Sequence, residues 1–112
     1  MAQARLQLPS SVQSGQLVRA RLLIQHPMDT GFFQDLSGKP IPRNIITELR
    51  CDYAGHTVFM AQPSTGIASN PLFEFYFKAI ESGEVWIRWI DDAGQAGQLR
   101  QVLMVEPAAG KS

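Results

Sequence analysis

The side chains in this sequence that most often take part in chemistry belong to one cysteine, two histidines and a pair of adjacent aspartates. A metal site would need several ligands to converge, but His26, His56 and Cys51 show neither C-x-x-C nor H-x-x-x-H spacing. Asp91 and Asp92 could pair as acid–base carboxylates, but their Asp-Asp-Ala-Gly context is typical of a turn, where aspartate accepts backbone hydrogen bonds. The sequence therefore predicts no catalytic residue, no metal site and no cofactor.

Other signatures of enzymes are also missing from the sequence. There is no G-x-S-x-G motif, no P-loop and no glycine-rich dinucleotide motif. A catalytic triad assembled in space leaves no mark in the sequence, so a metal- or thiol-dependent enzyme stays open as an alternative. We predict a protein that is not an enzyme.

The lone thiol, Cys51, lies between Leu49 and Tyr53 on the apolar side of an alternating segment. A cysteine buried in this way behaves as a small hydrophobic residue and is chemically inert. The alternatives are a redox thiol or a disulfide to a partner. One cysteine cannot form an internal disulfide, so the redox compartment stays undecided.

Length and charge narrow the class of protein. The chain has 112 residues, and its ten basic and ten acidic side chains cancel. We expect one domain over residues 1–112, with an ordered core at about 4–106 and a frayed tail at 107–112. The neutral balance argues against a nucleic-acid partner and gives no support to binding an anionic membrane. No apolar run is long enough for a membrane helix.

Six segments alternate between apolar and polar residues, a further short apolar run lies at 57–61, and no segment keeps a helical period for ten residues. Ser10–Gly15 is expected to be a turn, and Ile45 and Thr47 are expected to face the core with Leu49. Phe73, Phe75 and Phe77 are expected to point inward as well, each contributing about 1.5–3 kcal/mol on burial. The predicted strands are residues 5–8, 16–24, 45–53, 57–61, 73–79, 85–90 and 98–105. This pattern predicts an all-β fold, a β-sandwich of about seven strands.

The segment His26–Arg43 is too long for a hairpin turn and holds three of the seven prolines. Prolines restrict the backbone, so the loop can hold a defined shape at a small entropic cost. Its apolar residues, which we expect to be exposed, suggest a recognition loop. His26 could also hydrogen-bond across the base of the loop, and Arg43 could bind an anion or carboxylate. The candidate partner-binding residues are His26, Met28, Asp29, Phe32, Phe33 and Arg43.

Several motifs in the same order resemble the Z subunits of the sulfur-oxidation (Sox) carrier complex. They are the loop HPMDTG at 26–31, Gly38-Lys39, Ile41-Pro42-Arg43, the strand cysteine Cys51, Asn70-Pro71, the run FYFKA at 75–79, Glu81-Ser82-Gly83, and Trp89 followed by Asp91-Asp92. The resemblance covers roughly residues 5 to 105. One departure is Asp29, where the family usually has glutamate, so a contact made there could be altered.

The resemblance implies an immunoglobulin-like β-sandwich that forms a heterodimer with the SoxY subunit. The Y subunit carries sulfur on a cysteine, and the Z subunit supports it without catalysing a reaction. The resemblance also implies transient contacts with other Sox enzymes and no cofactor. The sequence MAQARLQLP is not a signal peptide, so composition alone predicts the cytoplasm. The resemblance instead implies the periplasm, reached by export with a signal-bearing Y subunit.

Two other interpretations stay open. The first is a free-standing immunoglobulin-like module that binds a small ligand or another protein. The second is that the isolated chain forms a homo-oligomer through its exposed loop.

Overall fold

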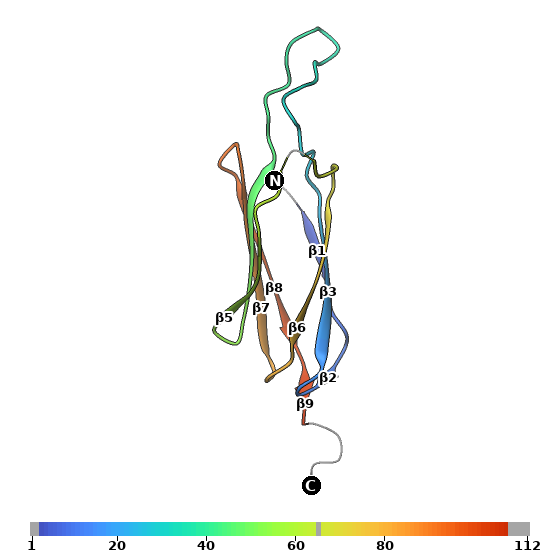
Figure 1. Cartoon of the computed structure of the whole chain (residues 1–112), viewed down its shortest axis with the longest axis vertical. Coiled ribbons are helices and arrows are strands. Elements are labelled where there is room, and N and C mark those ends of the chain that lie inside the picture. The colour runs from blue at the N-terminus through green and yellow to red at the C-terminus, as the bar shows by residue number, and fades with distance from the viewer. Residues whose placement is uncertain (1–2, 65, 108–112) are drawn as a thin grey trace.

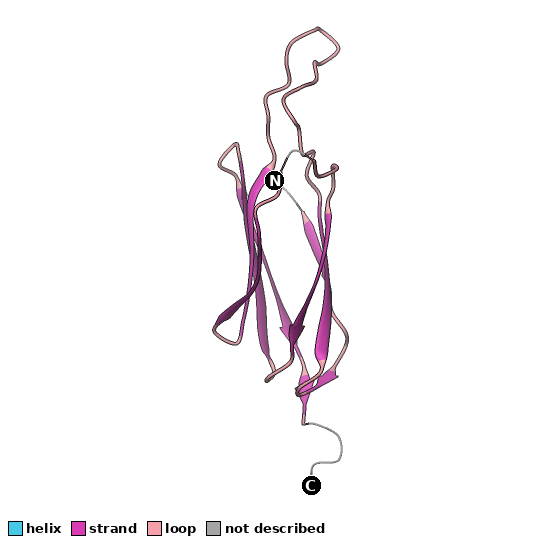
Figure 2. Cartoon of the chain, viewed as in Figure 1, coloured by secondary structure: helices cyan, strands magenta, loops and turns pink. Residues whose placement is uncertain are grey.

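The computed structural model describes residues 3–64 and 66–107, and every regular element in these residues is a β-strand. Figures 1 and 2 show two layers of strands that face each other, with a long loop extending from one end. The predicted all-β sandwich is therefore confirmed. Within the described part of the chain, no helix is long and apolar enough to cross a membrane.

One layer is a three-stranded antiparallel sheet in the order β1–β3–β6. Its strands are β1 (Ala4–Gln7), β3 (Leu17–Ile24) and β6 (Leu72–Lys78). The predicted alternation holds along the central strand β3, where every second side chain is fully buried and the others are exposed or half-buried. One face of this sheet therefore lies on the core and the other lies in solvent.

The second layer is a four-stranded antiparallel sheet in the order β5–β4–β7–β8. Its strands are β4 (Ile46–Tyr53), β5 (His56–Ala61), β7 (Gly83–Asp91) and β8 (Ala96–Leu103). Aromatic rings join the two layers: Phe59 stacks on Phe75 with centroids 4.3 Å apart, and Tyr53 packs on Phe77 at 5.0 Å. Phe75 and Phe77 are buried as predicted, but Phe73 is only half-buried.

The described residues form nine strands, two more than predicted, and the two additional strands are short. Val12–Gln13 forms β2 inside the predicted turn, and it pairs in parallel with β9 (Val105–Glu106). The strand predicted at 98–105 is interrupted at Met104, whose carbonyl accepts a hydrogen bond from the amide of Val12 at 3.1 Å. Two-residue strands are too short for alternation to reveal them. Of the predicted tail, residues 108–112 lie outside the described part.

The prediction of which β4 side chains face the core is wrong at the first residues of the strand. The pairing with β7 shifts between Ile46 and Glu48, so consecutive residues Ile45 and Ile46 are both buried while Thr47 is only half-buried. A bulge of this kind places two residues of one strand opposite one residue of the other and breaks the period of two. From Leu49 to Tyr53 the expected alternation returns.

Trp89 of β7 lies over the backbone of Gly97 in β8, its direct cross-strand neighbour. We predict that Gly97→Ala destabilises the fold by about 1–3 kcal/mol, because the added Cβ would overlap the rigid, buried indole ring. The matched control is Gly83→Ala, whose Cβ would meet open space, with an expected change below about 0.5 kcal/mol. Urea unfolding measures both, and equal effects would contradict the prediction.

Candidate partner-binding hairpin

The long loop is an extended hairpin that projects from the end of the sandwich, and residues 28–44 are called the projecting hairpin below (Figure 1). It connects β3 of one sheet to β4 of the other. Its two legs are paired near the base by Asp29 and Asn44, which exchange backbone hydrogen bonds of 2.9 and 2.8 Å. A second bridge joins Gln34 to Pro40 near the tip.

His26 lies at the base of the projecting hairpin and is buried, with 4% of its surface exposed. Its Nδ1 accepts a hydrogen bond from the amide of Met28 at 3.0 Å, so this nitrogen carries no proton. The proton is therefore on Nε2, which donates to Oδ2 of Asp91 at 3.0 Å. The predicted hydrogen-bonding role of His26 is confirmed, and its partners are now identified.

The backbone of His26 is also fully engaged. Its amide donates to Oδ1 of Asn70 at 3.0 Å, and its carbonyl accepts from the amide of Asn70 at 2.7 Å. Asn70 has a positive φ of 51°, a conformation that asparagine tolerates better than most residues. The turn before β6 and the start of the hairpin are thereby held together.

The expected exposure of Met28 is wrong, because only 4% of its surface is exposed. Its backbone is left-handed, with φ at 51°, and directly follows the rigid Pro27. This turn directs the side chain into the core, where Sδ accepts a hydrogen bond from the amide of Ile46 at 3.4 Å. Met28 therefore anchors the hairpin and does not lie on its surface.

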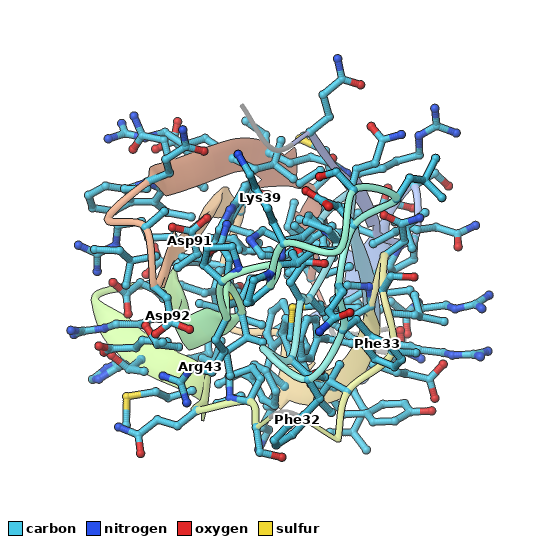
Figure 3. The ribbon with its side chains drawn as sticks, turned by 90° about the horizontal axis from the view of Figure 1, so that it is seen from above. Phe32, Phe33, Lys39, Arg43, Asp91 and Asp92 are labelled. Carbon is cyan, nitrogen blue, oxygen red and sulfur yellow. The ribbon has the colours of Figure 1, made fainter. Side chains whose placement is uncertain are left out.

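The returning leg is anchored by Asp92. Its carboxylate accepts a hydrogen bond from Nη2 of Arg43 at 2.8 Å and another from the amide of Ile45 at 3.1 Å. These two contacts hold the pKa of Asp92 below its ordinary value, with the Arg43 hydrogen bond as the larger cause. Figure 3 shows this pair, with Phe32 and Phe33 lying away from it. The carboxylate that Arg43 binds is thus in its own chain.

Gly31 lies where the two legs approach most closely. A Cβ at this position would be 3.2 Å from the Cβ of Arg43, and the φ of 89° lies in the region that favours glycine. Both the left-handed backbone and the close approach of the opposite leg require glycine here.

Asp35 orders the tip of the hairpin, although the Asp35 side chain itself is exposed to solvent. Its Oδ1 accepts hydrogen bonds from the amides of Ser37 and Lys39 at 2.9 and 3.0 Å and from the Ser37 hydroxyl at 2.7 Å. The Ser37 hydroxyl is the largest cause of a lowered pKa for Asp35. The tip therefore has a defined turn geometry in place of a random loop.

Three large apolar side chains project from this ordered tip into solvent. Their exposed fractions are 83% for Phe32, 68% for Phe33 and 109% for Leu36. The expected exposure of both phenylalanines is confirmed. Leu36 was not among the candidates from the sequence, although its place in the same loop could have indicated it. Exposed aromatic groups on a supported backbone are typical of a protein–protein contact.

The thiol of Cys51 lies outside this hairpin, in β4. Cys51 is 1% exposed, and burial, followed by the charge of Asp52, raises the pKa of its thiol to about 12. The prediction of a buried Cys51 is thus confirmed. Within residues 3–64 and 66–107, no three histidine, cysteine or acidic side chains are grouped so that they could hold a metal ion.

We predict that His26→Ala lowers the free energy of unfolding by at least about 2 kcal/mol, because it leaves Oδ2 of the buried Asp91 carboxylate and the amide of Met28 without their hydrogen-bond partner. The matched control is His56→Ala, at an exposed position beside a turn, with an expected change below about 0.5 kcal/mol. Urea unfolding of both variants provides the measurement. Similar small effects would mean that the hydrogen bonds around His26 do not support the fold.

Comparison with solved structures identifies several similar folds at low sequence identity. A superoxide reductase (neelaredoxin) from Ignicoccus hospitalis has a TM-score of 0.71 at 15% identity, covering 92% of this chain and 80% of that chain. A putative superoxide reductase from Thermotoga maritima has 0.70 at 14% identity, covering 92% and 85%. The sulfur carrier protein SoxY from Chlorobium limicola f thiosulfatophilum has 0.62 at 8% identity, covering 92% and 78%. These likenesses show the fold alone.

Comparison at the level of sequence is more specific. No curated protein matches the chain significantly. The family model described as sulphur oxidation protein SoxZ, however, matches residues 6–101, nearly the whole chain. The motifs in the projecting hairpin, the strand with Cys51 and β7 fall within this match. The chain therefore belongs to the SoxZ family of sulphur oxidation proteins.

Proposed function

We propose that this chain is the non-catalytic subunit of a two-subunit sulfur carrier, in which it binds and supports a SoxY-type subunit. Membership of the SoxZ family supports a role in sulphur oxidation. The similar fold of a protein described as the sulfur carrier SoxY is compatible with two related sandwiches forming one complex. In this arrangement the Y-type subunit carries the sulfur, and this chain holds it in place.

The observation that carries the proposal is the apolar tip of the projecting hairpin. Phe32, Phe33 and Leu36 expose large apolar surfaces at one end of the molecule. Aromatic anchors of this kind supply much of the affinity of protein interfaces. The hydrogen bonds of Asp35 and the paired legs order the hairpin in advance, so less conformational entropy is lost on binding.

The candidate residues then divide into two roles. Phe32 and Phe33 contact the partner directly, and Arg43, half-exposed beside Asp92, lies at the rim of the contact. His26 and Met28 are buried in the sandwich and act by setting the direction of the hairpin. The partly buried Asp29, whose backbone pairs with Asn44, belongs to this supporting set.

The state of Cys51 supports a role without sulfur chemistry. Because burial raises the pKa of the Cys51 thiol to about 12, the thiol is protonated at pH 7. Attack on a sulfur compound requires the thiolate and access to it. A thiol that is 1% exposed in the middle of β4 provides neither.

We further propose that the complex works in the periplasm, where this chain arrives together with a signal-bearing Y-type subunit and meets other Sox enzymes transiently. The family resemblance described above supports this location. Fractionation of the native host tests it: the chain should appear in the periplasmic fraction and should disappear from it when the Y-type gene is deleted.

We predict that Phe32→Asp and Phe33→Asp each weaken binding to the Y-type subunit by at least about tenfold, because each places a charge in an apolar contact. Isothermal titration with the purified subunits measures this effect. The matched control is Met60→Asp at an apolar residue on β5 that is 57% exposed, with an expected change below about twofold. Unchanged binding in both hairpin variants would remove the hairpin from the interface.

The same two variants test whether the chain associates with itself. The isolated wild-type chain should form oligomers at high concentration in sedimentation experiments, and the two substitutions should reduce them, because the apolar tip lacks its partner. A wild-type chain that stays monomeric and binds no Y-type subunit would instead favour the free-standing binding module.

We predict that Cys51→Ala retains near wild-type thiosulfate-dependent turnover when it is reconstituted with the Y-type subunit and the other Sox enzymes. Stability should fall by about 1 kcal/mol, because the substitution vacates volume in the core. Loss of turnover with an intact heterodimer, or a sulfur adduct on Cys51 in mass spectra, would contradict this prediction. A covalent heterodimer on a non-reducing gel would support a disulfide instead.

A further inference from the structure

Positive charge is concentrated on the solvent face of the three-stranded sheet. The whole chain has no net charge, but this face carries four basic side chains and one acidic side chain. The outward-facing charged residues of β1, β3 and β6 are Arg5, Arg19, Arg21, Lys78 and Glu74. Because the chain as a whole is neutral, the excess of positive charge is a property of this surface and not of the overall composition.

The solvent face of the four-stranded sheet provides the contrast. There, each of three arginines has an acidic partner: Arg50 and Arg88 both pair with Asp52, and Arg100 lies 3.6 Å from Glu84. Arg88 and Arg100 also lie over the ring of Trp86. Each of these three arginines therefore has a carboxylate partner within the chain, although Nε of Arg88 has no hydrogen-bond acceptor in the described residues. Glu48 adds a further negative charge.

On the three-stranded sheet, the carboxylate of Glu74 is the partner of two arginines. Oε2 of Glu74 accepts hydrogen bonds from Nε and Nη2 of Arg19 at 3.0 and 2.7 Å. Nε of Arg21 is 3.6 Å from the same oxygen and, within the described residues, is buried without a hydrogen-bond acceptor. Arg5 and Lys78 form no ion pair with any residue in the described part. This face has donors that lack an anion.

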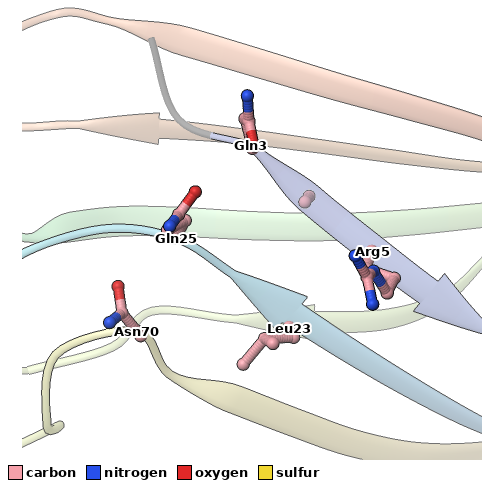
Figure 4. Close-up of a pocket in the computed structure, with 6 residues that line it drawn as sticks. Gln3, Arg5, Leu23, Gln25 and Asn70 are labelled. Carbon is pink, nitrogen blue, oxygen red and sulfur yellow. The ribbon is translucent and has the colours of Figure 1, made fainter.

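These cations line a groove that follows β1 and β3. Three depressions of about 340, 550 and 370 Å³ adjoin one another. The first and second share Arg5 and Leu23, and the second and third share Leu8 and Arg21, so they lie in a row along β1 and β3. Figure 4 shows the first, at the end of β1 near Asn70. From residue 3 to residue 9, the groove spans about 20 Å, the length of an extended segment of about seven residues.

The walls of the groove alternate between cationic and apolar groups. Along the outer face of β3, Leu17 and Leu23 flank the two arginines, and they are 71% and 45% exposed. Arg5 and Leu72 lie beside Leu23 on the neighbouring strands. Since side chains of an extended peptide project with a period of two, such a peptide could present carboxylates and apolar groups to this pattern.

We propose that this groove binds an extended acidic segment of a partner protein, in which every second side chain faces the groove and these side chains include both carboxylates and apolar groups. Guanidinium groups bind carboxylates in a paired geometry, which would suit the exposed Arg5 and the 41% exposed side chain of Arg21. The exposed leucines supply apolar area, and the local positive field speeds the encounter. The groove lies on a sheet face and the projecting hairpin at the end of the sandwich, so the two surfaces are separate.

The test uses the full chain and a labelled peptide of seven residues, with leucine, glutamate, glutamate and leucine at positions 1, 3, 5 and 7 and serine between them, so that all four lie on one face of the extended peptide. Fluorescence anisotropy should show binding of this peptide and none of its lysine counterpart. Binding should weaken by at least about tenfold in R5E/R21E and when NaCl rises from about 50 to about 300 mM. The matched control R50E/R100E changes the net charge equally on the other sheet and should alter binding by less than about twofold.

Three outcomes would overturn the proposal: no binding of the acidic peptide, equal loss in R5E/R21E and R50E/R100E, or tighter binding of duplex DNA or anionic phospholipid vesicles that R5E/R21E abolishes. If thermal unfolding shows that R5E/R21E does not fold, R5Q/R21Q takes its place. Phe32→Asp should bind the peptide as the wild type does, so the groove and the projecting hairpin are tested independently.

Discussion

The hydrogen bonds of His26 are the interaction on which the rest of this structure depends. One imidazole contacts the amide that begins the projecting hairpin and the carboxylate that ends β7, while its backbone is paired with Asn70 before β6. Both sheets and the hairpin therefore meet at a single buried side chain. Because each unsatisfied buried polar group costs about 1–3 kcal/mol, moving the hairpin would break several bonds at once. The direction of the hairpin is set by the core of the sandwich.

This anchoring explains how so exposed a segment can keep a shape. Residues 31–40 are all exposed and bury no core of their own. Their order comes from the buried Met28 at one leg, the Asp92 contacts at the other, and the Asp35 turn at the tip. Apolar groups can then remain in solvent without collapsing onto the sandwich. Such an arrangement suits a subunit that positions a partner, and the buried, protonated thiol of Cys51 agrees with a chain that does not itself carry sulfur.

The two proposed surfaces differ in the interactions through which they would bind a partner. The tip of the hairpin offers apolar area, which provides affinity that salt changes little. The groove on β1 and β3 offers an excess of cations over carboxylates, which favours rapid and salt-dependent encounters. A subunit that holds one partner stably and meets others briefly needs both kinds of contact. The sandwich keeps them apart, because one lies at the end where β3 leaves its sheet and the other lies on the face of that sheet.

The sequence by itself determined the all-β class, the long strands, the burial of Cys51 and the exposure of Phe32 and Phe33, because alternation and proline-rich spacing are local signals. Tertiary structure alone decided the rest. The parallel pair β2–β9 joins segments more than ninety residues apart. The bulge at Ile46 depends on its pairing with β7, and the inward turn of Met28 depends on the position of the His26 ring. The cationic groove likewise arises only where Arg5 and Arg21 come from strands that pair in space. Contacts between distant residues follow from the packing of whole sheets, and no window of neighbouring residues contains that information.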